Sequence, residues 1–141
     1  LIPIGKGEII RYGKDVAILA IGAMVAPALQ AAQELASSGI EATVVNARFA
    51  NPLDSELIID LASGIKRIVT VEENAVSGGF GSSVANLLQK SGMSDIQVKS
   101  IGIPDEFVEQ GSQAILRSKY GLDAKGIAQQ VLTLSGARVR T

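Results

Sequence analysis

Two adjacent carboxylates and a glycine-rich turn are the residues whose types and spacing best suit chemistry. Glu72 and Glu73 follow the apolar run 68–71, and a helical apolar pattern begins a few residues later. The turn between them contains, in order, Gly78, Gly79, Phe80 and Gly81. Backbone N–H groups at the start of a helix bind anions, and a pair of carboxylates can share one proton or meet a basic partner. The segment therefore has the composition of an anion site or of an acid–base site.

A structural role explains the same residues without any chemistry. The glycines do not match the dinucleotide fingerprint GxGxxG, and no lysine follows the last of them as in a Walker loop. The turn also follows the third buried strand of the pattern, whereas the dinucleotide fingerprint normally follows the first. We therefore favour a tight turn that packs a helix onto the sheet or onto another domain. One glutamate would then cap the turn or form a salt bridge across an interface.

Arg48 follows another predicted strand, within the segment 46–52. Its planar guanidinium can hold a phosphate or a carboxylate through two parallel hydrogen bonds. An ion pair that holds the loop, for example with Glu72 or Glu73, is the simpler explanation, and we favour it. Because the carboxyl ends of parallel strands meet at one edge, we expect Arg48 and the glycine-rich turn at the same edge of the sheet.

The composition limits the chemistry that this chain can perform. Its 141 residues include neither histidine nor cysteine, which removes the commonest proton shuttle, the commonest metal ligand and the thiol nucleophile. We therefore assign no catalytic, cofactor-binding or metal-binding residue. The 13 basic and 14 acidic residues nearly balance, so nothing indicates binding to nucleic acid or to an anionic membrane. Because the sequence begins with Leu1 rather than methionine, we expect a fragment of a longer protein.

Apolar segments alternate between strand-like and helix-like periods along the chain. The run 16–21 suits a strand buried on both faces, and the run 24–38 has helical spacing. Further strands are predicted around 43–45, 68–71 and 96–101, and further helices after Asp54, Gly81, Ser112 and Asp123. This alternation predicts one α/β domain over residues 1–141, with helices on both faces of an open sheet.

A short strand is predicted at 9–10, before the first long apolar run. A tight turn at 13–14 joins the two segments. Because tight turns connect antiparallel neighbours, we expect the short strand to be antiparallel to the strand that follows it.

Several short segments, taken in their order and spacing, resemble one family of enzymes. They are Ile4–Glu8, Gly13–Gly22, Val44–Phe49 with Pro52–Asp54, Val71–Asn74 with Gly78–Gly81, Gly102–Asp105 and Tyr120–Asp123. Together they resemble the C-terminal domain of the 1-deoxy-D-xylulose 5-phosphate synthases, which belong to the transketolase group of thiamine-diphosphate enzymes. The resemblance covers essentially the whole chain.

The resemblance implies a three-layer α/β/α sandwich whose mixed five-stranded sheet has one antiparallel strand. It also implies a three-domain homodimer that condenses pyruvate with glyceraldehyde 3-phosphate and releases carbon dioxide. Thiamine diphosphate and Mg²⁺ would lie between the two preceding domains, and this third domain would support the dimer and pack on the second. We therefore expect Arg48, Glu72, Glu73 and the residues 78–81 at an interdomain or dimer contact. A bacterial cytoplasm is the expected location, or a plastid if the source is a plant or alga.

Two other functions remain open from the sequence. One is the related β-subunit domain of 2-oxo acid dehydrogenases, which docks a partner protein. The other is a free-standing anion- or nucleotide-binding module that uses the glycine-rich turn. The first predicts co-migration with a lipoyl-bearing acyltransferase core, and the second predicts that the isolated chain binds a phosphate ligand.

Overall fold

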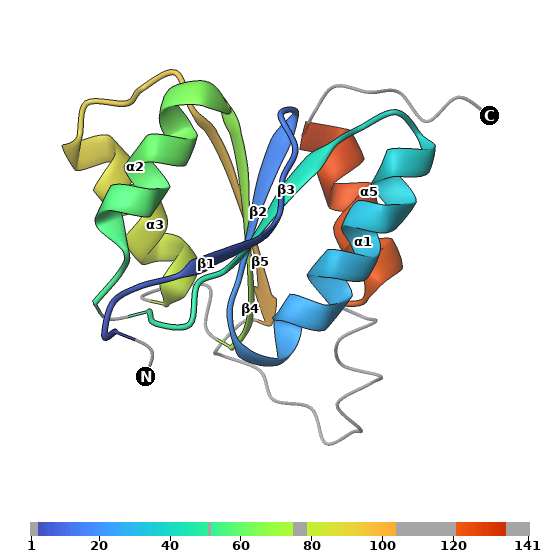
Figure 1. Cartoon of the computed structure of the whole chain (residues 1–141), viewed down its shortest axis with the longest axis horizontal. Coiled ribbons are helices and arrows are strands. Elements are labelled where there is room, and N and C mark those ends of the chain that lie inside the picture. Colours follow the sequence, from blue (N-terminus) through green and yellow to red (C-terminus); the bar gives the residue numbers. More distant parts are fainter. Residues whose placement is uncertain (1–2, 51, 75–78, 104–120, 135–141) are drawn as a thin grey trace.

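The computed structural model describes residues 3–50, 52–74, 79–103 and 121–134, so the helix predicted after Ser112 lies outside the described residues. They form a five-stranded sheet in the order β1-β3-β2-β4-β5, with helices on both faces (Figure 1). The strands are β1 (Glu8–Arg11), β2 (Val16–Ala20), β3 (Ala42–Asn46), β4 (Arg67–Asn74) and β5 (Gln97–Ile103). The helices are a 3-10 turn η1 (Gly22–Met24), then α1 (Val25–Ser37), α2 (Ser55–Gly64), α3 (Phe80–Lys90) and α5 (Ala124–Leu134). The predicted three-layer sandwich is confirmed.

The central strand β2 explains why its sequence is apolar at every position. It runs parallel to β3 on one side and to β4 on the other, and all five of its residues are buried. Helices cover both faces of the sheet, so a strand in the middle has no side that meets water. Outside β4, strand β5 continues the parallel pairing from Arg67↔Gln97 to Asn74↔Ile103.

Strand β1 is antiparallel as expected, although the tight turn after it does not place it beside the next strand in sequence. It pairs with β3, in a register that joins Glu8 to Asn46, and not with β2, which follows it in sequence. The expected direction is confirmed, because β2 runs parallel to β3 and therefore opposite to β1. The physical reason for the pairing with β3 is that β3 and β4 already occupy both edges of β2, so β1 completes the outer edge of β3 instead.

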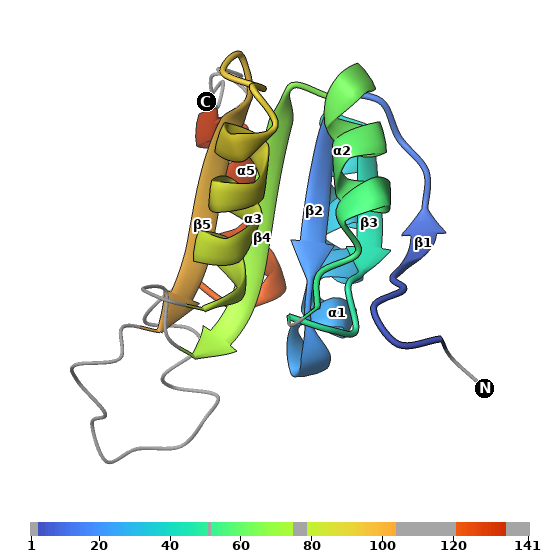
Figure 2. The same ribbon diagram turned by 90° about the vertical axis from the view of Figure 1, so that its left-hand side faces the viewer.

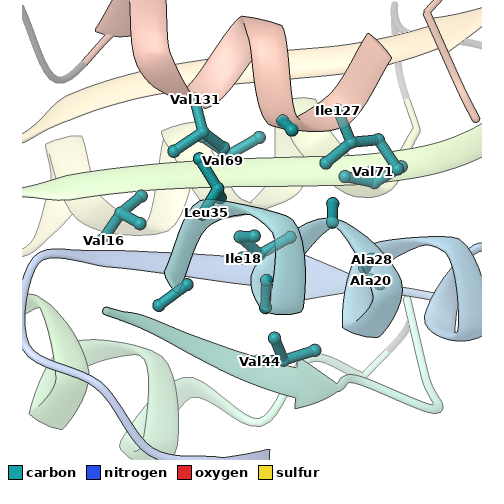
Figure 3. Packing of buried hydrophobic residues seen from close by; sticks show 14 of the residues in the cluster. Val16, Ile18, Ala20, Ala28, Leu35, Val44, Val69, Val71, Ile127 and Val131 are labelled. Carbon is teal, nitrogen blue, oxygen red and sulfur yellow. The ribbon is translucent and has the colours of Figure 1, made fainter. Parts of the chain in front are cut away.

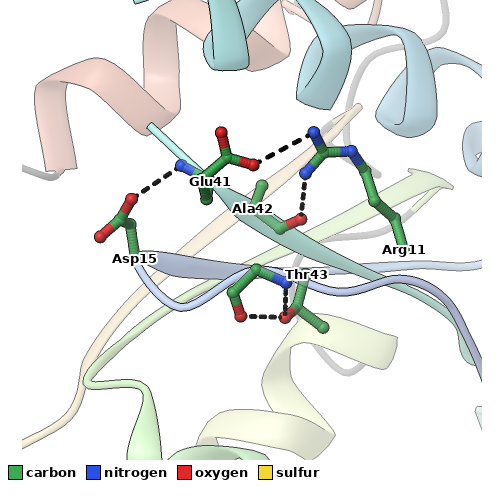
Figure 4. Close-up of polar contacts among 6 residues, drawn as sticks. Arg11, Asp15, Glu41, Ala42 and Thr43 are labelled. Atoms are coloured by element: carbon green, nitrogen blue, oxygen red, sulfur yellow. Dashed lines mark hydrogen bonds and ion pairs between the residues drawn. The ribbon is translucent and has the colours of Figure 1, made fainter. Parts of the chain in front are cut away.

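Polar contacts hold the turn between β1 and β2 against β3 (Figure 4). The Gly13 N–H donates to Thr43 Oγ1 at 2.9 Å, and the same hydroxyl donates to the Gly13 carbonyl at 2.6 Å. Asp15 Oδ2 accepts from the Glu41 N–H at 2.7 Å. Arg11 donates to the Ala42 carbonyl at 2.8 Å and to Glu41 Oε1 at 3.4 Å. These bonds fix the turn that carries the chain from β1 across β3 to β2.

Two apolar cores lie on opposite faces of the sheet. One is formed with α1 and α5, where Leu35, Ile127 and Val131 pack on residues of β2 and β4 (Figure 3). The other is formed with α2 and α3, where Phe80, Val84 and Leu88 are almost completely buried. Figure 1 shows these helix pairs on either side of the sheet, which is seen nearly edge-on.

Helix ends follow the signals in the sequence. After α1, Gly39 adopts a positive φ of 82°, and the N–H of Ile40 reaches back to the Leu35 carbonyl, which closes the helix. Asp54 caps α2, because its Oδ1 accepts from the Leu57 N–H at 3.2 Å. Asp123 Oδ1 accepts from the Gly126 N–H at 2.8 Å at the start of α5.

The carboxyl ends of β2, β3, β4 and β5 meet at one edge, which we call the carboxyl edge (Figure 2). The polypeptide also enters β1 from this edge, because β1 runs opposite to its neighbour β3. The carboxyl edge is where parallel α/β sheets place their functional groups.

Candidate functional site

Glu72 is the most strongly held polar side chain at the carboxyl edge. Strand β4 extends beyond the predicted run 68–71, so Glu72 lies within the strand and is only 5% exposed. Its Oε1 accepts from the Phe80 N–H at 3.0 Å, and its Oε2 accepts from the Gly81 N–H at 2.6 Å. These N–H groups begin helix α3. Its N-cap residue is Gly79, which has no side chain that could accept them. The Glu72 carboxylate therefore caps α3 from the neighbouring strand.

Two opposing effects act on the ionisation of Glu72. Burial disfavours the charged carboxylate and raises its pKa above the ordinary value of 4.5. The bonds from Gly81 and Phe80 favour the charged form and lower the pKa, but burial is the larger effect. The partial positive charge at the helix N-terminus acts in the same direction as these bonds.

Gly81 is needed because α3 approaches the sheet very closely. A Cβ atom at this position would lie 2.6 Å from Ser100 Oγ and 2.7 Å from Thr70 Oγ1. The two hydroxyl side chains, on β5 and β4, are themselves joined at 3.1 Å. The structural interpretation of Gly81, a turn that packs a helix onto the sheet, is therefore the one that the geometry supports.

The same geometry weighs against a phosphate site at this turn. A phosphate at the start of α3 would need the N–H groups of Phe80 and Gly81, and both already donate to the buried Glu72 carboxylate. The anion at this helix N-terminus is supplied by the chain itself. Gly78, the first glycine of the predicted site, lies outside the described residues.

A shallow, open hollow lies beside this cap, and we call it the edge hollow. Its volume is about 380 Å³, and its lining residues are Ile21, Gly22, Ala23, Ala50, Glu72, Glu73, Gly79 and Phe80. A second open depression, lined by residues that include Pro52, Leu53 and Ser83, shares Ala50, Gly79 and Phe80 with it. Small and apolar side chains thus dominate this part of the surface.

Arg48 lies at the carboxyl edge but does not reach the glutamates predicted as its partners. Its NH2 donates to Glu8 Oε1 at 2.7 Å, so the predicted loop-holding ion pair exists with a different residue. The expectation of Glu72 or Glu73 as partner was wrong because β2 lies between β3 and β4 in the sheet. The antiparallel pairing of β1 with β3 instead places Glu8 opposite Asn46, two residues before Arg48.

The backbone of Arg48 is strained. Its φ is 62°, and among the described residues it is the one non-glycine residue with a positive φ. A tight three-residue turn is centred on it, because the Phe49 N–H donates to the Ala47 carbonyl at 2.6 Å. This positive-φ conformation costs a side-chain-bearing residue about 1–3 kcal/mol. A partly exposed ion pair returns roughly 0.2–1 kcal/mol, which does not repay that cost.

Other residues of the edge were not singled out from the sequence. The edge hollow includes Ile21–Ala23, which follow β2 and lead into η1, and Ala50 from the connection after β3. Their spacing and type carry no chemical signal, and only the parallel pairing of β2 with β3 and β4 brings them together. The sequence indicates these residues in one way, which is their position just after predicted strands of a parallel sheet.

The described residues show neither a metal-binding cluster nor a membrane-spanning helix. In the described ranges, acidic side chains form no group of three or more that could hold a metal ion. No helix in the same ranges is long and apolar enough to cross a membrane.

Comparison with known proteins assigns the family. The family described as "Transketolase, C-terminal domain" matches residues 5–127, which is most of the chain. The chain belongs to the transketolase C-terminal domain family. This transketolase C-terminal domain is 55% identical over 136 residues to a 1-deoxy-D-xylulose-5-phosphate synthase of Dehalococcoides mccartyi. It is 58% identical over 127 residues to 1-deoxy-D-xylulose-5-phosphate synthase 1 of Geobacter sulfurreducens.

These alignments cover 96% and 90% of the transketolase C-terminal domain but only 22% and 20% of the two relatives. The chain therefore spans about a fifth of the length of the curated relatives that it matches.

Solved structures agree with the family and the fold. A structure described as "Split gene transketolase, inactive beta4 tetramer" superposes with a TM-score of 0.88 and 38% identity, over 96% of this chain and 44% of that one. A transketolase from Pichia stipitis superposes with a TM-score of 0.68 and 19% identity, over 94% of this chain and 18% of that one. The second likeness supports the fold of the transketolase C-terminal domain and nothing beyond it.

Proposed function

We propose that this chain is the C-terminal domain of a thiamine-diphosphate-dependent 1-deoxy-D-xylulose-5-phosphate synthase. The identity of more than half of the aligned residues to synthases from two bacterial genera supports this assignment. The parent enzyme would join pyruvate to glyceraldehyde 3-phosphate with loss of carbon dioxide. It would be a cytoplasmic homodimer, in keeping with the bacterial origin of the relatives named above.

In this proposal the domain serves assembly and holds no reacting group. The observation that carries this view is the bonding of Glu72, the one buried carboxylate among the described residues. Both of its oxygens accept N–H groups of α3, so the carboxylate stabilises the fold at the edge where a catalytic group would be expected. The adjoining edge hollow, with its small and apolar lining, suits contact with another protein surface.

The described residues of this domain do not fit thiamine diphosphate or Mg²⁺. A diphosphate needs free backbone donors or cations, and the donors at the start of α3 are taken by Glu72. Mg²⁺ prefers clustered carboxylate oxygens, and the described residues hold no such cluster. We therefore place both groups in the preceding domains and derive no catalytic step from this chain.

The substitution Gly79→Val in the full-length parent protein tests the assembly role. Gly79 has φ −97° and ψ −159°, an extended conformation that valine also adopts, so the added side chain mainly fills the edge hollow. We expect weaker assembly, measured by analytical ultracentrifugation, before any change in the chemical step. Gly64→Val is the control, because nothing lies within 4 Å of a Cβ at Gly64.

The same preparation separates the competing functions. Formation of 1-deoxy-D-xylulose 5-phosphate from pyruvate and glyceraldehyde 3-phosphate supports the synthase assignment, and its absence from a folded dimer argues against it. A fall in kcat with dimer and cofactor affinity intact would show that Gly79 does more than pack. Co-migration with a lipoyl-bearing acyltransferase would favour the 2-oxo acid dehydrogenase alternative.

A further inference from the structure

Arg48 keeps a strained backbone without a sufficient internal reason. Its positive φ would be relieved by glycine, and asparagine tolerates the same region. The backbone bonds of the turn, from Arg48 N–H to Asn46 Oδ1 and from Phe49 N–H to the Ala47 carbonyl, do not depend on the side chain at 48. A large, charged side chain at a strained position indicates that the side chain itself is needed.

The guanidinium of Arg48 uses few of its hydrogen-bond donors within the described part of the domain. Glu8 Oε1 is its acceptor in the described part of the chain, and it contacts one nitrogen. The Glu8 side chain is 54% exposed, so water competes for this pair. An arginine has five N–H donors in a planar fork. Arg11 provides a contrast, because it bonds both the Ala42 carbonyl and Glu41 at the opposite edge.

The incoming polypeptide passes beside Arg48. The Gly7 N–H donates to Asp54 Oδ2 at 2.9 Å, and a Cβ at Gly5 would lie 3.2 Å from Pro52 Cγ. Residues 5–7 therefore lie across the connection that leads from Arg48 to α2. Glu8, the partner of Arg48, is the first residue of β1. Whatever precedes this chain in a longer protein reaches the domain on the Arg48 side of the carboxyl edge.

We propose that Arg48 binds a carboxylate carried by the preceding domain of the same polypeptide, with Glu8 holding the guanidinium in position. The 2.7 Å contact with Glu8 shows that a carboxylate fits this guanidinium, and the remaining donors allow a second one to bind through two parallel bonds. The proposal rests on the proposed function in one respect, which is that other domains of the same enzyme precede this chain. It explains why arginine occupies a position where glycine would be less strained.

Limited proteolysis of the full-length parent protein tests this contact. The variants are Arg48→Gly, Arg48→Lys and the control Arg11→Ala, and the readout is the rate of cleavage at the junction before β1. Loss of one partner of a charge pair weakens a contact strongly, and cleavage follows the population of the open form. We expect Arg48→Gly to be cleaved at least about tenfold faster, Arg48→Lys to be intermediate, and Arg11→Ala to match the wild type.

Two further measurements separate the contact from a structural role. In 1 M NaCl, where charges are screened beyond about 3 Å, the wild type and Arg48→Gly should differ less than about twofold. In urea, the 141-residue chain with Arg48→Gly should unfold at the same or a higher concentration than the wild type, because the strain is relieved. Because Arg48→Gly also removes the ion pair with Glu8 at the start of β1, the 141-residue chain is the control for local fraying. Faster junction cleavage in the full-length variant, with no change before β1 in the isolated chain and no loss of domain stability, indicates a lost contact outside the domain.

Other results overturn the proposal. Equal cleavage of wild type and Arg48→Gly would show that no such contact exists. Conversion of Arg48→Gly from dimer to monomer, with the junction protected, would assign the carboxylate to the second copy. Failure of the synthase assay with the tenfold cleavage effect intact would reject the proposed function and leave the Arg48 contact standing.

Discussion

Replacement of Gly81 by alanine tests how closely α3 is packed on the sheet. The added Cβ would lie 2.6 Å from Ser100 Oγ, 2.7 Å from Thr70 Oγ1 and 2.9 Å from Ser100 Cβ. The two hydroxyl groups can rotate away, at the cost of the bond between them. Ser100 Cβ is fixed to the backbone of β5, so the helix itself must move. The Glu72 cap is strained in turn, because its bond to the Gly81 N–H depends on the position of that helix.

The size of the effect follows from two opposing contributions. Forcing one extra carbon into a well-packed core costs about 1–3 kcal/mol. Alanine recovers up to about 1 kcal/mol relative to glycine in a helix. We therefore expect Gly81→Ala to lower the free energy of unfolding by about 1–2 kcal/mol. For a domain of this size, that lowers the Tm by roughly 3–8 °C.

Urea and thermal unfolding, followed by circular dichroism, measure this effect. The matched control is Gly64→Ala, also in a helix, where nothing lies within 4 Å of the added Cβ. It should be neutral or stabilising by up to about 1 kcal/mol. In a Ser100→Gly background, which removes two of the three close atoms, Gly81→Ala should cost at least about 0.5 kcal/mol less. Equal stability of Gly81→Ala and Gly64→Ala would refute the close approach of α3.

Three further predictions concern two helix caps and one of the two cores. In the wild type, the raised pKa of Glu72 makes the unfolding free energy fall as pH rises from 4.5 through the folded-state pKa, and Glu72→Gln should remove this fall. Urea midpoints across that window check it, and a rise in wild-type stability over the same window would show that the N–H bonds outweigh burial. Asp54→Ala should cost about 1–2 kcal/mol, because it removes the α2 cap and the bond to Gly7, whereas Asp54→Asn should retain most of it. Leu35→Ala should cost about 2–5 kcal/mol by calorimetry, because the side chain is 1% exposed, and a loss below 1 kcal/mol would contradict its place in the core.

Local patterns predicted most of the elements. The apolar run 16–21 and the helical spacing of 24–38 correspond to β2 and α1, because each pattern has one period and clear ends. Asp54 and Asp123 were recognised as caps from their type and place before an apolar helix face, and both accept the expected backbone bonds. The preference for a packing role at the glycine-rich turn is supported at Gly81, where no side chain fits.

Sequence patterns were weaker wherever a partner is distant in the chain. The strand beside β1 depends on which edges of the sheet are already occupied, and the tight turn indicates the direction of β1 but not its neighbour. The partner of Arg48 was also missed, because β2 separates β3 from β4 and Glu8 comes within reach only through the pairing of β1 with β3. The end of β4 was also placed too early, because its pairing with β5 to Asn74 carries the strand past the apolar run.

The sequence by itself determined the class of fold, the boundaries of most elements and the lack of histidine and cysteine chemistry. These properties depend on composition and on periods of two to four residues, which are visible along one chain. Only the tertiary structure decided that Glu72 caps α3, that Arg48 is strained and paired with Glu8, and that the edge hollow is lined by small residues. Each of these depends on the order of strands in the sheet, and long-range pairing sets that order.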